Sequence, residues 1–223
     1  MHDPELGRVL DAITAERIGP YEASCGGDRA TALRLYVWNM EVSAAMWGLL
    51  HVLEVAYRNA AHRELTVLFG RPDWWSSPSV GLHPVGGRMV SEAARDLARS
   101  RKPATPSRMV AELRFGFWVS LLGKGNDYET RLWRPALHRA FPGYRGLRAP
   151  LHRELDLARL LRNRIAHLEP IHRRHLAADR ITLLRLIGMV SPAIERFARR
   201  HDRLPDVLAR HDDVRAGRAV ASF

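Results

Sequence analysis

The stretch RATALRLYVWNMEVSAAMWGLLHVLEVAYRNAAHRELTVLFG, residues 29–70, is the long helical segment of the chain. It is rich in Ala, Leu and Met, which favour helices, and Asp28 before it is a typical N-cap residue. Gly70 ends it. At about 1.5 Å per residue the segment could form one helix of about 60 Å. A break near Gly48 is equally consistent with the sequence, because glycine weakens a helix interior.

Helical periodicity continues on both sides of this segment, and no sustained alternating pattern predicts a strand. Gly19-Pro20 is expected to end a first helix, and loops are expected at 21–28, at the Pro- and Gly-rich 70–87, where Trp74 and Trp75 would anchor packing, and at 141–149. Further helices are expected at about 4–18, 88–101, 105–122, 128–140, 150–168, 177–201 with a kink near Pro192, and after Pro205.

No linker is rich enough in Gly, Ser or Pro to require two domains. The sequence therefore predicts one all-α domain over residues 1–223. Its core would cover about 29–201, preceded by an N-terminal helix and loop at 1–28 and followed by a C-terminal extension at 202–223.

The chain is strongly basic, with a formal net charge of +11. Almost all of its positive side chains are Arg, and the only lysines are Lys102 and Lys124. Arg suits bidentate contacts to phosphate, so the composition favours a nucleic-acid partner, although a genome rich in Arg codons would produce it as well. The single Cys25 excludes an intramolecular disulfide and fits a cytoplasmic protein, and no segment is long and apolar enough to predict a membrane span.

The segment LLRNRIAH, residues 160–167, places Arg162 five positions before His167, near the end of an expected helix. Asn163 and His167 are four positions apart and therefore share a helix face. Arg162 and His167 are about 140° apart around an ideal helix. They diverge within one chain unless the helix end is distorted, for which Pro170 gives a reason, or a second copy contributes.

Metal-free RNA cleavage needs a base for the ribose 2′-OH, an acid for the leaving 5′-oxygen and a cation for the phosphorane. Imidazole transfers protons near neutral pH, and guanidinium is a permanent cation that fits phosphate. Arg162, Asn163 and His167 are therefore candidate catalytic residues. In an Arg-rich chain the same spacing also arises by chance, as a surface Arg beside a His that the helix dipole stabilises.

The motif RNRIAHLEPI, residues 162–171, resembles the signature of Abi-like (abortive infection) proteins, a branch of the HEPN superfamily. The segments LYVWN at 35–39 and LHVLEVAYRN at 50–59 resemble the N-terminal helices of that family. FGFWVSLL at 115–122, followed by Leu132-Trp133, resembles its aromatic middle helix. These blocks run in family order across roughly residues 30–190.

The resemblance implies a HEPN-like helical bundle, usually dimeric, and an endoribonuclease of phage defence or toxin–antitoxin systems that leaves 2′,3′-cyclic phosphate ends. It implies catalytic roles for Arg162 and His167 and a supporting role for Asn163, in a composite site of a homodimer that acts on RNA. An antitoxin protein or a guarding non-coding RNA would be a further partner. Leu168 stands where many relatives carry a second His, so His167 would act without that neighbour.

Secondary candidates for RNA contact lie elsewhere in the chain. One group is spaced by four residues along an expected helix and fits either an RNA-binding face or a row of intrahelical salt bridges: Glu54, Arg58 and His62, with Asn59 beside them. Glu169 could orient His167 or face solvent, and Arg114 precedes an aromatic run that is more typical of a core than of base stacking. The irregular spacing of His167, His172 and His175 predicts no metal site, and no cofactor is expected.

Two other functions stay open from the sequence. A non-catalytic HEPN module would bind RNA or a nucleotide without turnover. A helical DNA-binding regulator is the less favoured alternative, because no clear helix-turn-helix pattern is present.

Overall fold

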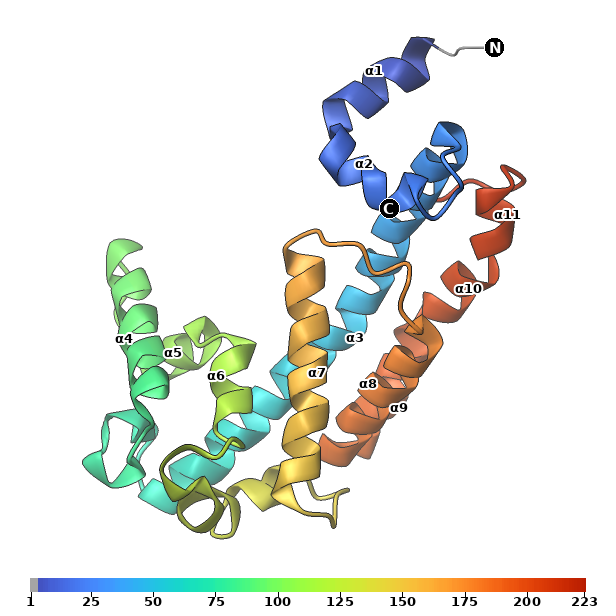
Figure 1. Cartoon of the computed structure of the whole chain (residues 1–223). Helices are drawn as coiled ribbons and strands as arrows, with labels where there is room; N and C mark the ends of the chain where they lie inside the picture. Colours follow the sequence, from blue (N-terminus) through green and yellow to red (C-terminus); the bar gives the residue numbers. More distant parts are fainter. Residues whose placement is uncertain (1–3) are drawn as a thin grey trace. The chain divides into compact units, whose positions relative to one another are not determined.

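The structure, a computed structural model, describes residues 4–223 and contains helices but no strand in that range (Figure 1). The predicted all-α fold is therefore confirmed. None of the helices in this range combines the length and the apolar character that a membrane span requires. The α-helices are α1 (Pro4–Ile13), α2 (Ala15–Glu22), α3 (Arg29–Phe69), α4 (Pro84–Arg99), α5 (Pro106–Glu112), α6 (Phe115–Ser120), α7 (Arg148–Ala166), α8 (Leu176–Val190), α9 (Pro192–His201), α10 (Leu204–Ala209) and α11 (His211–Arg215).

The long segment forms one uninterrupted helix, α3, of 41 residues. Of the two alternatives that the sequence leaves open, the continuous helix is confirmed, and Gly48 causes no break. A glycine inside a helix costs about 1 kcal/mol relative to alanine. Buried neighbours such as Met46, Leu49 and Leu50 outweigh that cost, since full burial of each stabilises the fold by about 1.5–3 kcal/mol.

The expected first helix at 4–18 is interrupted at Thr14, whose φ of 73° lies in the left-handed region. The prediction of one helix is wrong at this point, because a left-handed residue ends the helical hydrogen-bond pattern. α2 also continues past Pro20, where the sequence predicted its end. Proline removes only one backbone hydrogen bond there, and the helix stops within a turn of it.

The expected helix at 105–122 is two short helices, α5 and α6. They are separated by Leu113 and Arg114, both in extended conformations. The break is stabilised by a side-chain hydrogen bond, in which the indole Nε1–H of Trp118 donates to the Leu113 carbonyl at 3.1 Å. Helical periodicity alone does not indicate such a side-chain-to-backbone bond.

The expected helix at 128–140 is also divided. A π-helical turn covers Glu129–Trp133, and a 3-10 turn covers Leu137–Ala140. Pro135 lies between them, and its missing N–H prevents a continuous α-helix.

The later helices agree closely with expectation. α7 replaces the expected 150–168, and the expected 177–201 with its kink is α8 followed by α9, which begins at Pro192. The last predicted short helix is a pair, α10 and α11. Upstream, α4 begins four residues earlier than the expected 88–101, since Pro84 is favourable in a first helical turn.

Contacts between residues divide the chain into two compact units. Unit 1 comprises residues 1–49, 162–181 and 201–223, and unit 2 comprises residues 50–161 and 182–200. The single-domain organisation that the sequence suggests stays a prediction.

Unit 1 is held together by contacts of the first half of α3 with the C-terminal helices. Trp38 is buried, and its indole N–H donates to the Val207 carbonyl at 3.0 Å. Glu41, only 2% exposed, pairs with Arg210. A buried carboxylate is costly unless it is paired, so this ion pair removes a large penalty.

Unit 2 has an aromatic core. The prediction that Trp74 and Trp75 anchor packing is confirmed, since both are buried and Trp74 lies against Phe117 and Trp118. The Tyr57 hydroxyl donates to the Trp118 carbonyl at 2.7 Å, and complete burial raises the pKa of this phenol. The short helices α4, α5 and α6 lie side by side in this unit (Figure 1).

Candidate functional site

The candidate catalytic residues lie at the C-terminal end of α7, in unit 1. Ile165 is buried and anchors the last turn of the helix, while Arg164 and His167 are exposed beside it. Arg162 and Asn163 are half-buried. The three predicted catalytic residues therefore lie along the last two turns of α7 and its cap.

The end of α7 has the hydrogen-bond pattern of a Schellman motif. The Glu169 N–H donates to the Arg164 carbonyl at 2.8 Å, and the Leu168 N–H donates to the Ile165 carbonyl at 3.0 Å. Such a motif needs a left-handed residue after the cap, and glycine usually supplies it. Here the residue is Leu168, with a φ of 59°. The backbone beside His167 is therefore strained.

A contact from the N-terminal helices supports this strained residue. The Nη1 of Arg17 on α2 donates to the Leu168 carbonyl at 2.6 Å. The Leu168 side chain itself is 70% exposed, so packing contributes little to holding it. The carbonyl contact fixes the segment that follows His167.

The Arg162 guanidinium lies over an aromatic ring. Its Cζ is 5.2 Å from the ring centroid of Trp47, which is 38% exposed. A cation over indole at this distance is attracted by the ring quadrupole. The contact orients Arg162 and leaves part of an indole face open beside it.

His167 occupies the cap position, and its backbone N–H donates to the Asn163 carbonyl at 2.9 Å. Its imidazole makes no hydrogen bond or ion pair with any side chain in residues 4–223. The regular bond to Asn163 keeps the helical twist up to His167, so the angle of about 140° between Arg162 and His167 persists. The backbone distortion of this helix end begins at Leu168, after both residues.

Glu169 forms an ion pair with Arg164, from its Oε2 to the Arg164 Nε at 3.3 Å. Both side chains are about half exposed, and a pair of this kind contributes about 0–1 kcal/mol. Within residues 4–223, no hydrogen bond or ion pair joins the Glu169 carboxylate to His167, so the structure does not support the alternative in which Glu169 orients that imidazole.

Asn39 is a residue of this region that the motif analysis did not assign. Its side chain is 5% exposed, and its Oδ1 accepts the N–H groups of Ile171 and His172 at 2.8 and 3.0 Å. The amide therefore ties the loop after His167 to α3. An Asn within an apolar helical stretch is the available signal, since a buried amide needs hydrogen-bond partners.

His172 is a packing residue of the same loop. Its ring stacks on Tyr21 with centroids 4.7 Å apart, and its Nε2 lies 3.0 Å from the Ser24 Oγ. Burial, with a smaller effect of the nearby Arg173 charge, lowers the pKa of His172 to about 4. This imidazole is neutral near pH 7 and joins α2 to the loop.

No group of three or more His, Cys, Asp or Glu side chains in residues 4–223 is arranged to hold a metal ion. The local chemistry is that of one exposed imidazole with a guanidinium and an amide.

The secondary candidates on α3 belong to unit 2. Glu54 and Arg58 are half-buried, and the Arg58 Nε is buried without a hydrogen-bond partner in the described chain. His62 accepts the indole N–H of Trp74 at its Nδ1, at 3.1 Å, and burial lowers its pKa. His62 thus contacts the aromatic core, and the buried Arg58 Nε gives no support to a role in RNA contact.

Asn59 is exposed and lines a groove of about 640 Å³ in unit 2. The groove lies between α3 and the end of α8 with α9, and Ile194 and Phe197 give it an apolar wall. His51 and Arg63 contribute its polar side chains. Arg114 is exposed just before α6, so the structure separates it from the buried aromatic side chains that follow it.

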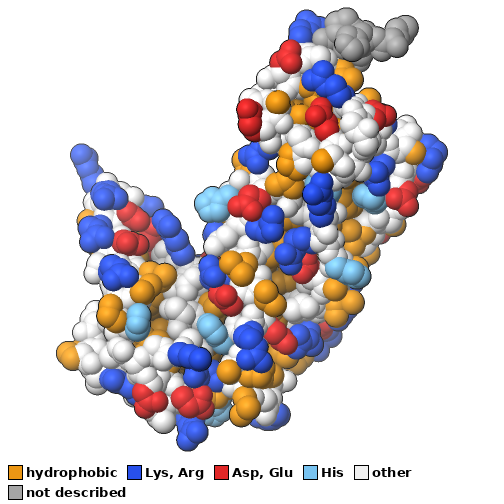
Figure 2. Space-filling model, viewed as in Figure 1, with side chains coloured by type: hydrophobic (Ala, Val, Ile, Leu, Met, Phe, Trp, Pro, Cys, Tyr) orange, Lys and Arg blue, Asp and Glu red, His pale blue; other side chains and the backbone are white. Residues whose placement is uncertain are grey.

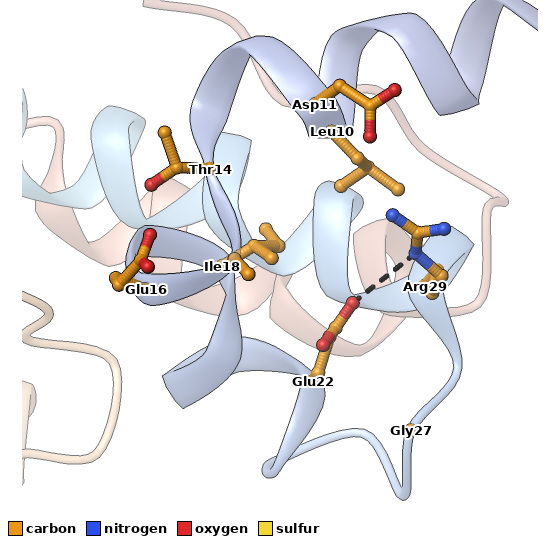
Figure 3. A pocket seen from close by; sticks show the side chains of 9 residues that line it. Leu10, Asp11, Thr14, Glu16, Ile18, Glu22, Gly27 and Arg29 are labelled. Atoms are coloured by element: carbon orange, nitrogen blue, oxygen red, sulfur yellow. Dashed lines mark ion pairs between the residues drawn. The ribbon is translucent and has the colours of Figure 1, made fainter.

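A second hollow, of about 550 Å³, lies among α1, α2 and the start of α3 in unit 1 (Figure 3). Asp11, Glu16 and Glu22 contribute carboxylates to it, and Arg29 pairs with Glu22 at 3.5 Å. An acidic hollow repels a polyanion, so it does not fit RNA.

The candidate site thus rests on the residues themselves and their geometry. Comparisons of the chain with protein-family models, with curated proteins and with solved structures found no match.

Proposed function

We propose that this chain is a metal-independent endoribonuclease of the HEPN kind, with Arg162, Asn163 and His167 as its catalytic residues. The observation that carries the proposal is the exposed imidazole of His167 at the end of α7, with Arg162 held on Trp47 in the preceding turn. A base and a fixed cation are the groups that phosphodiester transesterification needs.

In the proposed reaction His167 takes the proton of the ribose 2′-OH. The 2′-oxygen then bonds to phosphorus and the bond from phosphorus to the 5′-oxygen breaks. The products are a 2′,3′-cyclic phosphate and a 5′-OH, whose proton comes from solvent, while the imidazolium returns its own proton to solvent. Arg162 stabilises the charge on the phosphorane, and the Asn163 amide donates to a non-bridging oxygen.

We further propose a homodimer in which Arg162 acts with His167 of the partner subunit. The large angle between the two side chains within one helix supports a composite site. The biological setting we propose is cytoplasmic phage defence or toxin–antitoxin control, with an antitoxin protein or a guarding RNA as regulator.

The test compares wild type with His167→Ala and with His51→Ala, a control that removes an exposed imidazole of unit 2. Each protein is incubated with RNA in excess EDTA, and product ends are mapped. We expect His167→Ala to lose cutting about 100-fold or more and His51→Ala to retain it. Cutting that EDTA abolishes, or that His167→Ala retains, refutes the proposal, and RNA binding without turnover in the wild type supports a non-catalytic binding module.

The composite site has a separate test. In a dimer with one Arg162→Ala subunit and one His167→Ala subunit, one of the two shared sites keeps both its Arg162 and its His167. Half of the dimers in a random equimolar mixture are of this mixed kind. An equimolar mixture should regain about a quarter of wild-type activity if the subunits share each site. No recovery after exchange, confirmed by tagged subunits, contradicts the shared site.

A further inference from the structure

The helices α4 and α5 of unit 2 form a basic arm, defined as residues 84–114. One face of α4 is buried through Gly86, Ala93 and Leu97, and the helix contacts α5 and α6. Packing on this side fixes which residues of α4 face outward.

The outward face of α4 carries a row of guanidinium groups. Arg88, Arg95 and Arg99 are all exposed. Because they are seven and four residues apart, their side chains leave the helix within a sector of about 40° around its axis. They lie about 10 and 6 Å apart along the helix axis. Arg101 and Lys102, exposed just after the helix, extend the row.

The charge of the basic arm is not balanced locally. It contains seven Lys and Arg residues against three Asp and Glu residues. Arg99 pairs with Asp96, but no carboxylate in residues 4–223 pairs with Arg88, Arg95, Arg101 or Lys102. Figure 2 shows Lys and Arg side chains gathered over this part of the molecule, with a few acidic ones between them.

Outside the basic arm, about half of the Lys and Arg residues of unit 2 form an ion pair with a described carboxylate. Arg139, Arg148 and Arg185 each form an ion pair with a glutamate of the same unit. Arg residues without an ion pair in the described chain also occur elsewhere in unit 2, but in the basic arm Arg88 and Arg95 lie on one helix face and Arg101 and Lys102 follow directly, so cations are left in a row for an external anion. The outward face of the arm presents Arg and Ser side chains together with one exposed carboxylate, Glu92, so it suits a hydrated phosphate backbone better than insertion into lipid.

We propose that the basic arm is a second RNA-binding site, which holds the phosphate backbone of a long substrate. The proposal rests on the proposed function in one respect, that the bound polymer is RNA. Arg at repeated helical intervals contacts successive phosphates without reading bases, so binding depends on length and salt and not on sequence.

The experiment measures binding of full-length protein to a long, fluorescent 2′-O-methyl oligouridine, which cannot be cleaved by 2′-OH attack. The test variant is Arg88→Gln, Arg95→Gln, Arg101→Gln, Lys102→Gln. The matched control removes four exposed charges of the same unit that form no ion pair with described residues: Arg145→Gln, Arg153→Gln, Arg196→Gln and Arg200→Gln. Because the ligand is uncleavable, the result is independent of whether the chain is a nuclease.

In the test variant we expect the slope of log K against log salt to fall by about 3, and the Kd to rise about 100-fold at about 0.1 M salt. The control should change both much less, and replacing the same three Arg by Lys should preserve binding. Circular dichroism verifies folding of each variant. Equal losses in test and control variants overturn the proposal, because binding then depends on net charge alone. Tighter binding to duplex DNA than to the oligouridine overturns RNA as the ligand.

Discussion

The left-handed backbone of Leu168, next to His167, can be tested by comparing the stability of variants that differ only in backbone freedom at this position. A residue with a Cβ in the left-handed region is strained by about 1–2 kcal/mol, and Gly is not. Gly also costs about 0.5–1 kcal/mol through the greater freedom of the unfolded chain. Leu168→Ala and Leu168→Gly both lose the side chain beyond Cβ, which is 70% exposed. The difference between the two variants therefore isolates the left-handed strain.

We expect Leu168→Gly to be more stable than Leu168→Ala by about 0.5–1 kcal/mol, equivalent to roughly 1–4 °C in Tm. The control is Ala44→Gly on the exposed face of α3 in unit 1, where the order must reverse and glycine should destabilise by about 0.5–1 kcal/mol. Urea unfolding followed by circular dichroism measures all four proteins. If Leu168→Gly is less stable than Leu168→Ala by the amount seen at the control position, Leu168 is not left-handed and the reasoning fails.

Three further predictions concern residues of the same unit. Asn39→Ala should destabilise by about 1–3 kcal/mol in urea unfolding, because two buried N–H groups lose their acceptor, and an unchanged midpoint would contradict this role. The pKa of His172 is lowered to about 4 in the folded chain, so the unfolded chain binds the proton first and the free energy of unfolding should fall as the pH drops from about 6.5 towards 4. His172→Gln should remove this part of the pH dependence, which urea unfolding curves at pH 7 and pH 5 measure. Trp47→Leu should remove about 0.5–1 kcal/mol of cation–π stabilisation, and coupling with Arg162→Ala in a double-mutant cycle checks it.

Much of the fold could be predicted from the sequence because local signals coincide with it. The composition of residues 29–69, with Asp28 before and Gly70 after, predicts α3 within its observed bounds. Pro192, a residue that is favourable in a first helical turn, likewise marks the start of α9. Prediction failed at Leu113, where a Trp118 side chain bonds to the backbone carbonyl, and at Thr14, where φ is positive; helical periodicity indicates neither feature.

The candidate site divides in the same way. Arg162, Asn163 and His167 lie in the last two turns of α7 and its cap, near the end of a helix as the sequence suggested. The contacts of Arg17 and Asn39 with the following loop join residues more than a hundred positions apart. Such long-range pairs depend on how the helices pack, and a single sequence holds no record of that.

The hydrogen bond between Trp74 and His62 has a consequence for the tautomer of that imidazole. An indole N–H can only donate, so the Nδ1 of His62 must present its lone pair, and the ring proton resides on Nε2. Any group that meets the other side of this ring therefore meets a donor. A phosphate or carbonyl oxygen fits there, whereas an ammonium or amide N–H does not. Protonating His62 would put a second N–H against the indole, so its neutral form and the packing of Trp74 persist together.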